Sequence, residues 1–394
     1  MNKKTELPAI LGGKPKFTER MPITKPTLPS LKKILPSISA VLESAMITNA
    51  TYVKLLEEQL REYLGVKHAI VVSSCTSGLM LLFKALKLKG EVILPSFTFS
   101  ATGHVVLWNN LKPVFVDVKA DTYNIDPKAV KKAITKRTCA ILGAHIFGNP
   151  ADIENLEQIA KDKNIKLFFD AAHCFGSNYK GSPIGRFGDA EAFSMSPTKL
   201  LTSAEGGLVT TDNDELAYQI KIGRSYADPG NYDTQYEGLN ARMSEFNAIL
   251  GLESLKVLGE NVANRKKLVR VYIDKLKDIP GISFQKIETG AASSNKDFSI
   301  FIDKLKFGLN RDQLVTALDK ENITTKKYFF PPLHKQKAFS KYFRKFDAQL
   351  PNTNNLADNI LSLPLFSHMD IEDASKVSYA IKNIYHNRGN IKVL

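Results

Sequence analysis

Short apolar segments alternate with helical patterns along the first half of the chain. The segments 69–73, 91–95, 113–117, 138–145 and 166–170 are apolar and have the length of buried strands. Between them, apolar residues recur at helical spacing, which predicts helices after residues 74–78, over about 101–108 and 127–134, and from about residue 152. This alternation is typical of crossover connections, so we expect an α/β fold with a mainly parallel sheet flanked by helices.

The two ends of the chain follow other patterns. Residues 1–40 contain six prolines, which predict an extended arm lying on a larger body, and a helix is expected from about Thr51. A long helical pattern runs from Arg242 towards Leu276, and a second unit follows Pro280, with a strand near 298–302 and helices near 311–318 and 374–385. We therefore predict an N-terminal arm (1–45), a large domain (46–255) and a smaller C-terminal α+β domain (256–394).

Composition narrows the class of protein. The 394 residues are 43% hydrophobic and 24% charged, as in ordinary globular enzymes, and no apolar run approaches the roughly 20 residues of a membrane span. The start of the chain shows no signal-peptide pattern. Cys75, Cys139 and Cys174 stand in isolated contexts that give neither a disulfide framework nor the spacing of metal ligands. We therefore expect a cytoplasmic protein without a structural metal.

The net charge is 54 − 40 = +14, which favours anionic ligands such as nucleotides and phosphorylated cofactors. Nucleic-acid binding is the competing interpretation. The basic residues are spread thinly along the chain, however, and no segment matches a recognition module, so we expect no nucleic-acid partner.

One lysine is a candidate nucleophile. Lys199 lies between an apolar strand that ends at Ser194 and another over 208–211, and Gly206-Gly207 closes the segment with residues that allow positive φ and close backbone approach. Desolvation at such a turn disfavours the ammonium and lowers its pKa. Taken alone, a solvated surface lysine is the commoner outcome.

Three further features precede Lys199 at the ends of predicted strands. The segment Ser74-Cys75-Thr76 lies before a helix and suits a phosphate, Phe99 offers a ring face, and Asp170 ends a strand. Each has a structural alternative: a helix cap, a core aromatic, or a carboxylate in a turn. Together with Lys199 they meet the needs of pyridoxal 5′-phosphate (PLP), which requires a phosphate anchor, a ring partner, a counter-ion for the ring nitrogen and a covalent tether.

At these residues the chain resembles the sugar-nucleotide aminotransferases of the DegT family, within the fold type I PLP enzymes. The resemblance covers nearly the whole chain. It is carried by these segments: Met46-Ile-Thr, Ser74-Cys-Thr-Ser-Gly-Leu, Pro113-Val-Phe-Val-Asp-Val, Asp170-Ala-Ala-His, Phe193-Ser-Met-Ser-Pro-Thr-Lys-Leu-Leu, Glu205-Gly-Gly, Gly238-Leu-Asn-Ala-Arg-Met-Ser-Glu, Pro331-Pro-Leu-His and Leu361-Ser-Leu-Pro-Leu.

The resemblance implies a role for each matching residue. Lys199 and Asp170 would be catalytic, Lys199 as the Schiff-base lysine and Asp170 as the partner of the pyridine nitrogen. The other implied cofactor contacts are Ser74, Cys75, Thr76 and Ser194 at the phosphate, Phe99 stacked on the ring, His173 near the phenolic oxygen, and Asn240 reaching the phosphate in a neighbouring subunit of a homodimer. Cys75 stands where the family usually has glycine, and His173 replaces the commoner glutamine.

The implied reaction is transfer of an amino group from L-glutamate to a nucleotide-diphosphate keto sugar, as in amino-sugar and O-antigen biosynthesis. The segments Leu88-Lys-Gly-Glu-Val-Ile and Asn109-Asn-Leu-Lys-Pro-Val-Phe look most like the 4-amino-4,6-dideoxyglucose type. A 3-keto sugar, a cyclitol ketone and a PLP-binding regulatory protein without turnover stay open as alternatives. Family members that dehydrate carry histidine at the Schiff-base position, and this chain has Lys199 there.

Overall fold

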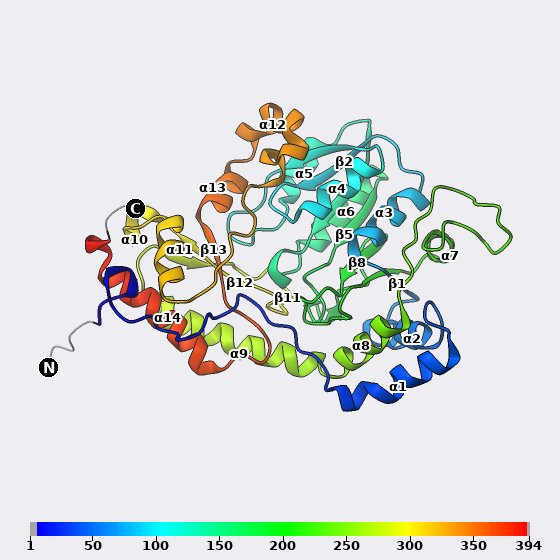
Figure 1. Ribbon diagram of the computed structural model, residues 1–394. Helices are drawn as coiled ribbons and strands as arrows, with labels where there is room; N and C mark the ends of the chain where they lie inside the picture. The colour runs from blue at the N-terminus through cyan, green and yellow to red at the C-terminus, as the bar shows by residue number, and fades with distance from the viewer. Residues whose placement is uncertain (1–5, 392–394) are drawn as a thin grey trace.

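A seven-stranded sheet forms the centre of the larger of two units (Figure 1). The computed structural model describes residues 6–391. The strand order is β1-β9-β8-β5-β4-β2-β3; β9 runs antiparallel to both neighbours, and the other neighbouring pairs are parallel. The expected α/β fold with a mainly parallel sheet is therefore confirmed. The strands are β1 (His68–Val72), β2 (Glu91–Pro95), β3 (Lys112–Val116), β4 (Thr138–Ala144), β5 (Lys166–Asp170), β8 (Ala190–Ser194) and β9 (Gly207–Thr211).

Three of the helices that follow these strands, α3, α5 and α7, begin at side-chain caps. Ser74 forms a capping box with Ser77 at the start of α3, and Asn213 caps α7 through the Leu216 N–H. Asp126 caps α5, whose first residue is proline, the residue best suited to that position. The helices around the sheet are α2 (Thr51–Leu64), α3 (Cys75–Ala85), α4 (Ser100–Trp108), α5 (Pro127–Ala133), α6 (Ile153–Lys163), α7 (Asp214–Gly223) and α8 (Glu245–Lys256).

A second unit has an antiparallel sheet of its own, in the order β10-β12-β13. Its elements are α9 (Leu258–Leu276), β10 (Ile282–Phe284), β12 (Phe298–Ile302), α10 (Lys304–Phe307), α11 (Arg311–Lys320), α13 (Pro351–Asn359), β13 (Ile360–Leu363) and α14 (Ile371–His386). Helix α12 (Ser340–Phe346) packs instead on the large unit, where Phe346 contacts Phe115 of β3. The long helical pattern towards Leu276 is two helices, α8 and α9, that meet at Val257. Helix α9 connects the two units, because Leu258 packs in the core of the first and Leu268 in that of the second. The domain limits stay a prediction.

A small third sheet joins the two units. Its order is β11-β6-β7, where β6 is Asn178–Tyr179, β7 is Ser182–Pro183 and β11 is Ala291–Ala292. Strand β11 lies in the polar loop 288–296 that precedes β12, and its pairing with β6 holds this loop against the large unit.

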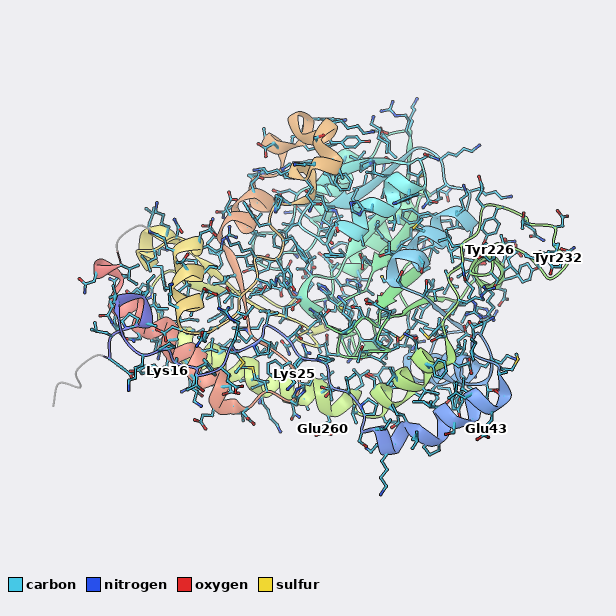
Figure 2. All side chains as sticks on the ribbon, in the orientation of Figure 1. Lys16, Lys25, Glu43, Tyr226, Tyr232 and Glu260 are labelled. Carbon is cyan, nitrogen blue, oxygen red and sulfur yellow. The ribbon has the colours of Figure 1, made fainter. Side chains whose placement is uncertain are left out.

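The N-terminal arm is not extended throughout. Residues 31–44 form a helix, α1 (Leu31–Ser44), with Pro36 inside it, so the prediction of an extended chain to residue 40 was wrong. A proline removes one backbone hydrogen bond. Apolar residues at helical spacing, Leu31, Ile34, Ile38 and Val41, nevertheless favour a helix here, and Val41 is buried. Figure 2 labels Lys25 on the preceding irregular segment and Glu43 on α1.

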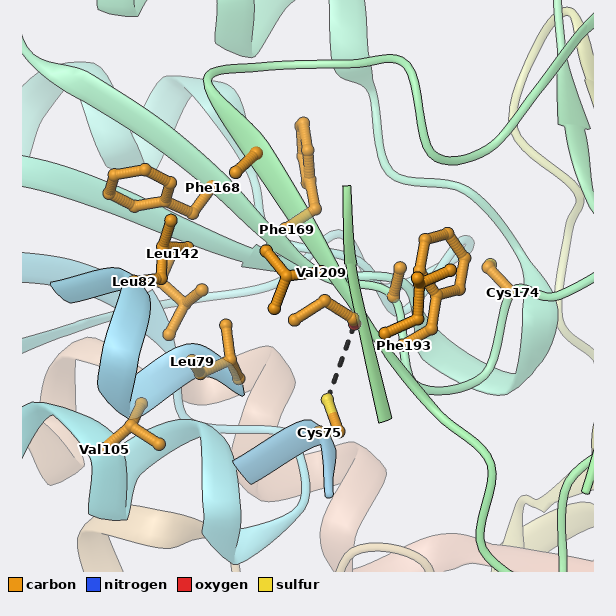
Figure 3. Packing of buried hydrophobic residues seen from close by; sticks show 14 of the residues in the cluster. Cys75, Leu79, Leu82, Val105, Leu142, Phe168, Phe169, Cys174, Phe193 and Val209 are labelled. Carbon is orange, nitrogen blue, oxygen red and sulfur yellow. Dashed lines mark hydrogen bonds between the residues drawn. The ribbon is translucent and has the colours of Figure 1, made fainter. Parts of the chain in front are cut away.

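The core of the large unit lies between the sheet and its helices (Figure 3). Leu79 and Leu82 of α3, Val105 of α4 and Phe168 of β5 are all fully buried there. Cys75 lies at the edge of this cluster, where its thiol donates to the Ala192 carbonyl at 3.5 Å. The first residue of α3 is therefore packed against the sheet at the strand ends. Within residues 6–391, no helix is long and apolar enough to cross a lipid bilayer.

Candidate active site

A cavity of about 390 Å³ opens at the carboxyl ends of the parallel strands. Register explains its place: Ala144 of β4 pairs with Asp170 of β5, so β4 and β5 end together, and β8, where Ala192 pairs with Asp170, continues two residues further to Ser194 at the cavity. Eight of the nine residues predicted for the site line this cavity: Ser74, Cys75, Thr76, Phe99, Asp170, His173, Ser194 and Lys199. The ninth, Asn240, is exposed and forms a β-bridge with Ser225, outside the cavity of this chain.

The Ser74–Thr76 segment forms the first turn of α3 and its cap. The Ser74 hydroxyl accepts from the Ser77 N–H at 3.0 Å, which holds the helix start in place at the cavity wall. Gly207 makes this possible, because a Cβ there would lie 2.3 Å from the Ser74 carbonyl carbon. A helix start with hydroxyls beside it attracts an anion through its free N–H groups and its dipole.

Asp170 is held by three donors on two sides. Thr102 donates to Oδ2 at 2.7 Å, the Ala172 N–H donates to Oδ1 at 3.1 Å, and the Cys75 thiol lies 3.8 Å from Oδ1. These three contacts fix the orientation of the carboxylate. Burial and the Asp170 charge raise the pKa of the Cys75 thiol, so Cys75 remains a protonated donor. The carboxylate is thus fixed and ready to pair with a cationic group in the cavity.

Lys199 projects into the same cavity from the turn between β8 and β9. Burial lowers its pKa to about 8, and the positive charge of Lys296 acts in the same direction. The two glycines of this segment let neighbouring groups pack closely against the backbone. A Cβ at Gly207 would clash with Ser74, and one at Gly206 would clash with Ser203. The expected positive φ lies instead at Ala204, with φ 65°. Near pH 8 a large fraction of Lys199 is therefore a neutral, nucleophilic amine.

His173 is a neutral imidazole with a defined tautomer. Its Nδ1 accepts from the Phe147 N–H at 3.2 Å, so the proton lies on Nε2. Burial lowers the pKa of His173 well below its usual value, and the charges of Lys199 and Lys296 lower it further. His173 can therefore donate a hydrogen bond from Nε2 to an oxygen in the cavity.

Comparison with known proteins identifies the family. Residues 30–382 match the model of the DegT/DnrJ/EryC1/StrS aminotransferase family. The chain belongs to this aminotransferase family. It is 33% identical to the dTDP-4-amino-4,6-dideoxy-D-glucose transaminase of Escherichia coli, over 91% of this chain and 97% of that one. It is 34% identical to the spore coat polysaccharide biosynthesis protein SpsC of Bacillus subtilis, over 87% and 92%. Its fold matches DesI, solved with its TDP-sugar product, with TM-score 0.88, 32% identity and 96% of each chain covered.

The aminotransferase is PLP-dependent, and the residues of the cavity fit that cofactor. The Ser74–Thr76 segment and Ser194 supply phosphate donors, Asp170 a partner for a protonated ring nitrogen, and Lys199 an amine of lowered pKa. Phe99 is 58% exposed at the cavity, where its ring face is available for stacking. When bound, PLP supplies an electron sink for the carbon that loses or gains a proton. Within residues 6–391, no group of three His, Cys, Asp or Glu side chains could hold a metal ion.

The aminotransferase cavity also has walls that the sequence patterns did not predict. Lys296, Tyr328 and Phe329 come from the second unit, more than 90 residues beyond Lys199. Burial raises the pKa of Tyr328 to about 12, so it remains a neutral phenol. Tyr328 therefore offers a neutral hydroxyl group at the cavity wall. A lysine in a polar loop gives no signal of burial in the sequence, and only the contacts of the folded chain reveal it.

Other polar residues at the strand ends hold the second unit in place. Asp117 accepts from the Thr353 N–H and hydroxyl, both at 2.8 Å, and from the Asn352 N–H at 3.0 Å. Ser96 lies 2.7 Å from Nδ1 of the buried His334. Neither Asp117 nor His334 lines the cavity. These residues therefore position the segments that carry Tyr328 and Phe329.

Proposed function

We propose that this aminotransferase moves an amino group from L-glutamate to the C4 keto group of a nucleotide-linked 6-deoxy sugar, namely dTDP-4-keto-6-deoxyglucose. The observation that carries the proposal is the 33% identity to the dTDP-4-amino-4,6-dideoxy-D-glucose transaminase of E. coli, along nearly all of both chains. The net charge of +14 supports a polyanionic substrate. The product would be dTDP-4-amino-4,6-dideoxyglucose, an amino-sugar precursor of surface polysaccharides such as O-antigen.

Four residues of the cavity would take part in this reaction. Lys199 would hold the cofactor and would move the proton at the reacting carbon in both halves of the cycle, since burial lowers the pKa of its amine to about 8. Asp170 would pair with the protonated ring nitrogen. His173 would donate from Nε2 to the phenolic oxygen, and Phe99 would offer its ring face for stacking.

The link to Lys199 has a direct test. Purified protein should absorb in the visible, and borohydride should fix the cofactor to the peptide that contains Lys199. Label on any other lysine would end this assignment.

The substrate is tested with the pyridoxamine form of the enzyme and a panel of nucleotide keto sugars. We expect dTDP-4-keto-6-deoxyglucose to be aminated at C4, with NMR locating the amine. The free keto sugar should lose orders of magnitude in kcat/KM, because the diphosphate contributes charge-assisted hydrogen bonds that orient the sugar. An amine at C3, or equal activity on the free sugar or on a cyclitol ketone, would refute the substrate and favour the corresponding alternative.

Two non-enzymatic functions would give results different from those expected of an aminotransferase. A regulatory PLP-binding protein would show no half-reaction with L-glutamate, measured as the spectral change of the bound cofactor. A nucleic-acid binder would hold no PLP. The family match makes the second reading untenable as the main function, and intact Lys199 and Asp170 argue against the first.

We further infer a homodimer with shared active sites. Helix α1 and the residues after it expose large apolar side chains, Leu31, Leu35, Leu42, Met46 and Ile47, each at least half accessible. Such a contiguous apolar stretch is typical of an interaction surface. Asn240 follows an exposed segment whose Tyr226 and Tyr232 project from the body (Figure 2).

Complementation tests the shared site. Mixing Asn240→Ala with Lys199→Ala subunits should restore part of the activity, because one site of each hybrid dimer is intact. If both residues served the same site within one subunit, mixed dimers would recover nothing. Sedimentation velocity would give the size of the assembly independently, and a monomer would refute the homodimer.

We also infer a cytoplasmic enzyme. The three cysteines, Cys75, Cys139 and Cys174, are free thiols, as is usual in a reducing compartment. Cell fractionation tests this, with activity expected in the cytosolic fraction and contradicted by activity in a secreted or membrane fraction.

A further inference from the structure

Lys296 is a buried lysine in the wall of the cavity, 4% exposed, with no assigned role. The loop that carries it is fixed to the large unit at several points. Strand β11 pairs with β6, the Ser294 N–H donates to the Ser177 hydroxyl at 3.0 Å, and the Lys296 N–H donates to the Phe147 carbonyl at 3.1 Å. A lysine held by its backbone in this way keeps its ammonium at one place in the cavity wall.

The charges around Lys296 leave a surplus of one positive charge. Asp297 pairs with the Lys296 ammonium at 2.8 Å, and both side chains are buried. The buried Arg265 is attracted to the same carboxylate and donates to the Lys296 carbonyl at 2.6 Å. Two cations thus share one carboxylate. The Lys296 ammonium has three N–H donors, and its bond to Asp297 uses one of them.

Lys296, Lys199 and His173 line the same cavity. The charge of Lys296 lowers the pKa of both Lys199 and His173. Lys296 is therefore a buried cation in the wall of the cavity that holds the reacting amine, close enough to disfavour the charged form of that amine.

The two substrates differ in the group that such a cation would meet. An amino-acid donor carries a carboxylate on the same carbon as its amino group, so the carboxylate must lie one bond from the reacting carbon. The keto sugar has hydroxyl groups around its reacting carbon and carries its negative charges on the distant diphosphate. A fixed ammonium beside Lys199 therefore matches the donor and not the sugar.

We propose that Lys296 binds the α-carboxylate of the amino-acid donor and, with Asp297 and Arg265 behind it, forms the donor subsite of this enzyme. The inference rests on the proposed aminotransferase reaction and adds the residue that selects the donor. Asp297 and Arg265 are positioning residues, which hold the ammonium in place and leave it its net charge.

The test compares L-glutamate with its α-amide, L-isoglutamine, in the donor half-reaction of wild type and Lys296→Met. In wild type the α-amide should be poorer in kcat/KM by roughly 10- to 100-fold, the range for loss of one charge-assisted hydrogen bond. In Lys296→Met this preference should fall to a fewfold. Binding of α-methyl-L-glutamate, measured by calorimetry, should weaken by a similar factor, which gives a readout that does not depend on turnover.

Three further variants control the result. Lys296→Arg should restore part of the preference, since it keeps the charge. The double variant Lys296→Met/Asp297→Asn removes both charges of the buried pair, so that no buried carboxylate loses its ammonium partner. It replaces Lys296→Met if the single variant does not fold. Lys180→Met removes an exposed, ion-paired lysine and should leave the preference unchanged.

The keto-sugar half-reaction separates the two claims. Because loss of the Lys296 charge also raises the pKa of Lys199, the keto-sugar half-reaction of Lys296→Met is measured over a range of pH, and its maximal rate should fall by less than the preference for the α-carboxylate does. An unchanged preference for the α-carboxylate in both variants, or a loss confined to the keto-sugar half-reaction, overturns the donor subsite. If wild type itself aminated no keto sugar yet reacted with L-glutamate, the proposed substrate would fail while the donor subsite stood.

Discussion

Removing the charge of Lys199 should stabilise the enzyme when no cofactor is bound. Burial lowers the pKa of Lys199 from 10.5 to about 8, which means that the charged ammonium destabilises the folded protein. At about 1.4 kcal/mol per pKa unit, this shift corresponds to roughly 3 kcal/mol. Because part of the side chain remains accessible, we expect about 2–3 kcal/mol of it in the measured stability. Apoprotein carrying Lys199→Met should therefore unfold at higher urea concentration than wild type at pH 7.

The pH dependence identifies the cause. The folded protein releases the Lys199 proton near pH 8, whereas the unfolded chain keeps it to about 10.5. Between these values the unfolded state binds more protons, so wild-type stability rises with pH relative to the variant. Between pH 7 and pH 9.5 this proton release should raise the unfolding free energy of wild type by roughly 2 kcal/mol relative to Lys199→Met. Less than half of the stability difference between the two proteins should therefore remain at pH 9.5.

The assay is urea unfolding of both apoproteins at pH 7 and 9.5 and at one protein concentration, since an oligomer's stability depends on concentration. Lys166→Met, which removes a lysine that is 46% exposed, is the control and should show no such pH dependence. A stability difference for Lys199→Met that is absent, or the same at both pH values, would refute the argument from burial.

Three other substitutions test the rest of the site. Asp170→Asn should retain cofactor but lose most turnover, because the ring nitrogen loses its anionic partner; near wild-type turnover of the folded variant would contradict this. Thr102→Val removes a 2.7 Å donor to Asp170 and should lower kcat by about tenfold with the cofactor spectrum retained, and an unchanged kcat would show the donor to be dispensable. Gly207→Ala should displace the α3 start and weaken cofactor retention, measured by dialysis, whereas Gly259→Ala, where a Cβ meets nothing within 4 Å, should not.

The sequence predicted the active site best at the strand ends, where the residues that end a strand also line the cavity. Strands β2 and β5 have the predicted limits, because parallel strands buried on both faces are continuous apolar runs that end in turns. Polar residues directly after such runs fall at one edge of the sheet, so Asp170 and Ser74 could be assigned to one site before any coordinates. Lys199 needed its strand context as well, since a lysine alone predicts only a solvated surface.

Other features depend on tertiary contacts that no local pattern encodes. The six prolines of the N-terminal region outweighed the helical spacing of Leu31, Ile34 and Ile38, although only Pro36 falls inside α1. Lys296 lies in a polar loop and is buried because β11 pairs with a hairpin over 100 residues earlier.

Some polar residues at the strand ends bind other parts of the protein, and others border the cavity. One edge of the sheet can therefore both hold the second unit in place and form the active site. Asp117 accepts hydrogen bonds from the N–H groups at the start of α13, and Ser96 is hydrogen-bonded to His334. Asp117 and Ser96 therefore use their polar atoms to hold other segments of the protein. Asp170 accepts from Thr102 and yet still borders the cavity. The order of strands decides the difference. Asp117 follows β3 at the outer edge of the sheet, where the C-terminal segments dock, whereas Asp170 ends β5 at its centre, between β4 and β8. The cavity therefore extends from β5 towards β1, where Ser74 follows the strand, because the opposite outer strand, β3, is covered by C-terminal segments.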